Sequence, residues 1–226
     1  MNRNRSIAVV CVIFALAFAG ATPQRMQAQE GKNPYPTSMA PLGQYLMDRE
    51  AEIALARSAA PPPISKDATV LVLGKDGYET AVQGTNGFVC SVDRSWMDQF
   101  EDTPEFWNPK RRGPICDNAE AAKTRVPLIM IRTRLALAGK SKAEIKEGLK
   151  AAIEKGQVPA REPGGMAFMM SKQGHLSDRD GHWFPHLMFY GSAKDYASKP
   201  SETGESTSIF TLIVDKWSDG TPAPPK

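Results

Sequence analysis

The chain has 226 residues, of which 41% are hydrophobic and 23% charged, a composition typical of one globular domain. Its 28 basic and 25 acidic residues give a formal net charge of +3. So small an excess provides no basic face of the kind that binds nucleic acid, and we expect no nucleic-acid partner.

The N-terminus has the pattern of a secretory signal peptide. Arg3 and Arg5 precede an uncharged apolar run, residues 7–21, which ends in small residues. The run is shorter than the roughly 18 to 20 apolar residues that cross a bilayer. We therefore expect cleavage after Ala21, no transmembrane segment in the mature chain, and a secreted or periplasmic location. Residues 22–41 are polar and proline-rich, which predicts a flexible segment.

Two cysteines remain after that cleavage, Cys90 and Cys116. In an oxidising compartment such a pair favours one disulfide, and two separate buried thiols are the alternative. Closing this loop stabilises the fold by roughly 3.5 kcal/mol in the chain-entropy description.

Ordered structure is expected from residue 42. Apolar residues recur at helical spacing over 42–57 and predict an amphipathic helix. Three consecutive prolines, 61–63, predict an extended spacer. The runs 68–74, 78–84 and 88–93 are then separated by the turn sequences GKDG and GTNG, which predicts a three-stranded antiparallel meander with Cys90 in its third strand.

The segment 94–112 lacks periodicity but holds four large aromatic residues. We expect it to fold over the core, with ligand contact as the alternative. Its basic triplet, 110–112, is expected to face the acidic residues of the same segment in solvent. The four aromatic residues are Trp96, Phe100, Phe106 and Trp107, and the acidic residues are Asp98, Glu101, Asp102 and Glu105.

Helices follow from Asp117. Pro127 is expected to divide a short helix from a second one that ends at Ala138. Ser141 and Glu144 have the spacing of a capping box and predict a further helix ending at Lys155.

Three more strands are expected, at 166–170, 183–190 and 208–217, with a polar loop at 192–207 and a disordered tail at 218–226. The sequence thus predicts one α+β domain, residues 42–217, in which a single antiparallel sheet of about six strands is covered by helices.

The stretch 166–191 contains all three histidines, His175, His182 and His186, and four of the ten methionines. Imidazole and thioether ligands suit zinc or copper, so the three histidines are candidate metal ligands. The spacing matches no established zinc signature. In an unbroken strand His182 and His186 would share a face but lie roughly 13 Å apart.

A hydrolase is a second interpretation, because Ser171 or Ser177 could be a nucleophile next to a histidine oriented by Asp178 or Asp180. None of the motifs GxSxG, SxxK or HExxH accompanies these residues, so no catalytic residue can be assigned.

A small-ligand site is the third interpretation. His182, His186 and Tyr190 would be polar anchors on one strand face, with Phe184 and Met188 as an apolar wall. The opposite face, with Trp183, Leu187 and Phe189, would then belong to the core. The two faces could also be exchanged.

The runs GGMAFMMS, GHWFPHLMF and IVDKWSDGTP resemble exported bacterial proteins of unassigned function over the last third of the chain. The resemblance implies export and a bacterial origin, and no activity or site residue.

The leading hypothesis from the sequence is an exported protein that binds a small molecule without catalysis. A metal-assisted or histidine-dependent enzyme and an envelope structural or interaction protein are the alternatives. The ligand and the oligomeric state stay open.

Overall fold

The computed structural model describes residues 35–98, 104–160, 163–178, 181, 183–191 and 208–225. The expected signal peptide and the loop 192–207 lie outside these ranges. Within them, no helix is both long and apolar enough to cross a bilayer. In chain order the elements are η1 (Leu42–Gln44), α1 (Arg49–Arg57), α2 (Pro62–Ser65), β1 (Thr69–Gly74), β2 (Gly77–Val82), β3 (Val89–Asp93), η2 (Ser95–Met97), β4 (Gly113–Asp117), α3 (Ala119–Leu137), α4 (Lys142–Glu154), β5 (Gly165–Met169), β6 (His186–Tyr190) and β7 (Ser208–Ile213).

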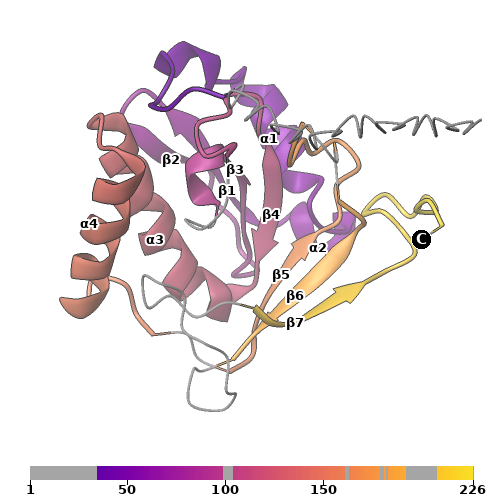
Figure 1. Cartoon of the computed structure of the whole chain (residues 1–226). Helices are drawn as coiled ribbons and strands as arrows, with labels where there is room; N and C mark the ends of the chain where they lie inside the picture. The colour runs from indigo at the N-terminus through magenta and orange to yellow at the C-terminus, as the bar shows by residue number, and fades with distance from the viewer. Residues whose placement is uncertain are drawn as a thin grey trace, which may run out of the picture. The chain divides into compact units, whose positions relative to one another are not determined.

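The strands form one seven-stranded sheet in the order β2-β1-β3-β4-β5-β6-β7, with α3 and α4 on one side of β1–β4 and α1 on the other (Figure 1). Successive residues of β1 point to opposite faces. Leu71 and Leu73 therefore belong to the core cluster of α3 and α4, whereas Val70 and Val72 belong to the cluster of α1. The predicted α+β class and single helix-covered sheet are confirmed.

The sheet is mixed, and the predicted meander is wrong. β3 lies on the far side of β1 from β2 and runs parallel to β1, with Thr69 opposite Val89. The connection after β2 crosses the start of β1 at Gly84, where a Cβ atom would lie 2.1 Å from the Thr69 nitrogen. Glycine allows this close approach of two backbones.

The strand that we did not predict is β4, which directly follows the segment 94–112. It pairs antiparallel with β3 and places Cys116 directly opposite Cys90. The predicted disulfide between these two residues is confirmed. Upstream of β4, three aromatic side chains of residues 94–112 are buried in the core cluster of α3 and α4, as expected; they are Trp96, Phe106 and Trp107. Phe100 lies outside the described residues.

Prolines account for further differences from the sequence prediction. Pro61 is the N-cap of α2 and the next two prolines are its first helical residues, where no N–H group is needed. Pro127 lies inside a continuous α3. It removes only one backbone hydrogen bond, and buried residues on both sides hold the helix against the sheet.

The helix expected over 42–57 is split into η1 and α1, with Asp48 capping α1.

The predictions for the start of α4 and for the C-terminal tail had different outcomes. The capping box of Ser141 and Glu144 at the start of α4 is present. The tail after β7, expected to be disordered, is held by hydrogen bonds: the Ser218 N–H donates to the Met170 carbonyl at 3.0 Å, and its hydroxyl donates to the Ser58 carbonyl at 2.6 Å. Trp217 is buried beside them, so the fold continues past residue 217.

Candidate functional site

Two of the residues predicted to bind a ligand, His186 and Tyr190, lie on the same face of β6 and are buried. Their exposed fractions are 2% and 7%. Tyr190 belongs to a core cluster with Ala121 of α3 and Ala167 of β5. The face of β6 that we expected to line a site therefore packs against α3 at its Tyr190 end, which is the exchanged assignment.

The His186 imidazole is satisfied by its own chain. Its Nδ1–H donates to the Phe184 carbonyl oxygen at 2.8 Å, and burial lowers the pKa of the ring despite this hydrogen bond. The neutral ring is thus favoured, as expected of an interior histidine.

The other two predicted residues are not part of β6, which begins at His186 and is shorter than the expected strand. Phe184 is exposed. Trp183 is exposed too, with its ring centroid 5.7 Å from that of His186. His182 lies outside the described residues.

His175 occupies a separate place, in the loop after β5. Its backbone N–H and C=O groups form hydrogen bonds with those of Arg112, just before β4. Its Nε2–H donates to Asp178 Oδ1 at 2.8 Å, and this hydrogen bond is the main cause that lowers the pKa of Asp178. Nearby, burial and then the charges of Glu105 and Asp178 raise the pKa of Tyr35 to about 12.

Neither the metal nor the hydrolase interpretation gains support from these positions. Among the described residues, no three His, Cys, Asp or Glu side chains are grouped so that they could hold a metal ion. The Ser171 hydroxyl lies 2.6 Å from the Ser58 hydroxyl and accepts the Gln173 N–H at 3.1 Å. It is thus engaged away from His175. Asp180 is outside the described residues.

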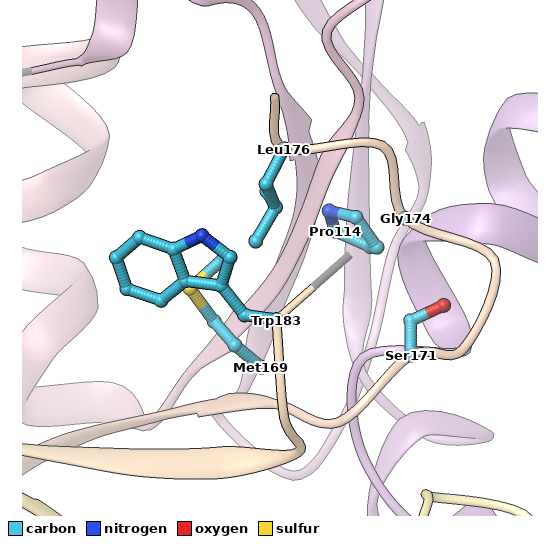
Figure 2. Close-up of a pocket in the computed structure, with 6 residues that line it drawn as sticks. All are labelled: Pro114, Met169, Ser171, Gly174, Leu176 and Trp183. Atoms are coloured by element: carbon cyan, nitrogen blue, oxygen red, sulfur yellow. The ribbon is translucent and has the colours of Figure 1, made fainter. Parts of the chain in front are cut away.

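A shallow depression lies beside Trp183. Figure 2 shows Trp183, Met169 and Leu176 at one end of it and Pro114, Gly174 and Ser171 at the other. Its empty volume is about 230 Å³, counting the open space above it. Because that volume includes open solvent, the depression encloses far less than the roughly 300 to 1,000 Å³ of a small-ligand pocket.

The most distinctive feature was not predicted: the large apolar side chains that are exposed in the described ranges all flank or belong to the β6–β7 end of the sheet. Their exposed fractions are Trp183 54%, Phe184 40%, Phe210 55%, Leu212 43% and Ile213 40%. We call these five residues the apolar patch. Monomeric proteins seldom expose apolar groups together, and such patches mark binding surfaces.

The patch borders an open sheet edge. β7 is the last strand of the sheet, and Figure 1 shows no described helix or strand beyond it. The Val214 N–H donates to the Pro185 carbonyl at 2.9 Å. By the alternation of an antiparallel ladder, Leu212 also points its backbone groups toward β6, whereas Thr211 and Ile213 point theirs outward.

The sequence does not mark this strand as an edge. Residues 208–214 carry no charge and no proline, although natural edge strands are commonly protected by such residues. We interpreted the run only as the last strand of the sheet.

In comparisons with known proteins, no family model, no curated protein and no solved structure matches the chain. The interpretation of the site therefore depends on its geometry alone.

Proposed function

We propose that this protein is a non-enzymatic binding protein that takes up an extended polypeptide at the outer edge of β7. The observation that carries the proposal is the gathering of exposed large apolar side chains at that edge. Backbone groups of an edge strand supply affinity by adding a strand, and neighbouring apolar side chains supply specificity.

The structure's polar groups support binding over catalysis. The candidate polar anchors His186 and Tyr190 are interior residues, and the depression by Trp183 is small for a metabolite. Export belongs to the same proposal, because the Cys90–Cys116 disulfide fits an oxidising compartment. The function is thus that of an exported interaction protein.

A display library of short random peptides tests the proposal. Wild type should enrich uncharged peptides of alternating apolar pattern, and binding should protect the amides of Thr211 and Ile213 from hydrogen exchange. Thr211→Pro removes an outward N–H, a change that an edge strand tolerates, and should weaken binding by about tenfold or more.

Thr211→Val is the matched control, since it keeps the N–H and should bind as wild type does. If Thr211→Pro does not fold, Ile213→Lys places a charge on the same edge and replaces it. Enrichment of no peptide, or equal binding to all variants, would contradict the proposal.

A further inference from the structure

We infer that the polypeptide bound at this edge is a second copy of the same chain, paired antiparallel through β7 about a two-fold axis at Leu212. This inference rests on the proposed function, because it names the occupant of the same edge. A two-fold interface uses one surface twice, so a self-complementary strand is the minimum requirement.

The backbone of β7 meets that requirement. Thr211 and Ile213 point their N–H and C=O groups outward, and in this register Thr211 of each copy lies opposite Ile213 of the other. The two pairs would exchange four backbone hydrogen bonds. The irregularity in the β6–β7 pairing lies near Ser208, outside the residues that would pair.

The side chains support the same register. Leu212 would face Leu212 of the second copy, and Phe210 would face Val214, whose N–H is bound to Pro185. Val214 of the other copy would then lie between Phe210 and Pro185, the residue that follows Trp183 and Phe184. Phe210 and Leu212 would thus lie on one face of the paired strands and Ile213 on the other.

The area of the patch matches what a dimer needs. Large apolar side chains of roughly 200 Å² each, about half exposed, amount to roughly 500 Å² per copy. A standard interface buries about 800 Å² per partner, of which homodimers make about 65% apolar. The exposed apolar area of the patch is therefore of the order that a homodimer interface requires.

Charge does not oppose the pairing. No charged residue occurs between 208 and 214, so the antiparallel register brings no like charges face to face. The first charges beyond the strand, Asp215 and Lys216, follow the residues that would pair. A charged peptide partner would find no complementary charge on this strand.

Sedimentation of the exported, purified chain between about 1 and 100 μM tests the inference, because dimer affinities of standard interfaces fall at or below this range. Wild type should be dimeric at the upper end. Leu212→Asp places two carboxylates at the axis and should raise the dimer dissociation constant by about a hundredfold or more. Thr80→Asp, at an exposed position of β2 on the opposite edge, is the matched control and should dimerise as wild type does.

Mixing two variants makes the test specific to the axis. Leu212→Lys alone should be monomeric, and an equimolar mixture with Leu212→Asp should recover the dimer because the charges then attract. A single added cysteine tests the register of the pairing. Leu212→Cys should form an intermolecular disulfide in air, since the Cα atoms of opposed residues at such positions lie about 4.5 Å apart. Thr211→Cys should cross-link far less.

The outcomes separate this inference from the proposed function. A monomer at all concentrations that still binds library peptides at β7 overturns the self-pairing and leaves the function standing. A monomer that binds no peptide overturns both. A dimer that survives Leu212→Asp uses another surface and overturns the self-pairing.

Discussion

The two ends of the sheet differ in what they bury. Around β1–β4, where helices cover both faces, charged groups lie inside: the Arg94 side chain is 0% exposed and its partner Glu52 is 1% exposed. Around β6 and β7, large apolar side chains lie in solvent. Charged side chains are usually exposed and large apolar ones buried. The first region departs from this rule by burying charges, and the second by exposing apolar side chains.

The buried charges of the first region hold the fold together. The Arg94 guanidinium donates to Glu52 Oε2 at 2.8 Å and to the Tyr45 carbonyl at 2.8 Å, and Glu52 Oε1 accepts the Leu73 N–H at 3.0 Å. Arg125 of α3 likewise pairs with Asp93 and Asp117. These ion pairs connect α1 and α3 to the sheet. A structural role therefore accounts for the burial of both charged clusters.

Removing one carboxylate from the first region should have the largest effect. Glu52→Ala leaves the Arg94 charge buried without its partner and should lower the free energy of unfolding by about 3 to 5 kcal/mol. Glu79→Ala breaks the exposed pair with Arg49 and should cost less than about 1 kcal/mol. Urea titration followed by circular dichroism measures both, and equal losses would show that burial of the first pair is unimportant.

One substitution made at both ends should separate the regions next. Leu71→Ala empties space in the core of α3 and α4 and should lower the free energy of unfolding by about 3 kcal/mol. Leu212→Ala removes an exposed side chain and should change it by less than about 0.5 kcal/mol. The measurement is made at low protein concentration, so that any dimer is dissociated. A loss at Leu212 as large as that at Leu71 would mean that the patch is covered within one chain.

Local patterns in the sequence predicted most elements. Short runs of strand-forming residues bounded by glycine turns predicted β1, β2 and β3, and the Ser141 capping box predicted α4. The sheet order could not be predicted, because it depends on how the chain crosses β1 at Gly84, and local sequence patterns do not show such contacts between distant segments. β4 was missed because its sequence GPICD begins with a glycine and a proline, which are typical of a turn and disfavour a strand assignment.

The candidate site was harder to predict because strand periodicity gives two faces without saying which one a helix covers. His186 and Tyr190 were correctly placed on one face, which packs against α3 at its Tyr190 end. Proximity in sequence was a poor guide to the histidines, since the loop after β5 carries His175 to Arg112. An edge strand is defined by a missing neighbour, which no property of residues 208–213 alone reveals.

The smallest expected effect concerns His186, at the border of the two regions between Met169 of β5 and Ile213 of β7. Burial lowers the pKa of its imidazole in the folded chain, whereas the unfolded chain keeps a value near 6.5. As pH falls through about 6.5, the unfolded chain takes up the proton first, so the free energy of unfolding decreases. The stability from this group is complete above the unfolded pKa and declines below it.

His186→Gln keeps a donor for the Phe184 carbonyl and removes the titration. The difference in unfolding free energy between wild type and this variant should be constant above pH ~7.5 and should shift against wild type between about 7 and 5, with a slope below about 1.4 kcal/mol per pH unit. Urea titrations across this range measure it. Parallel profiles would mean that water reaches the α3-facing side of β6, and the open region of the sheet would then begin one strand earlier than the exposed residues indicate.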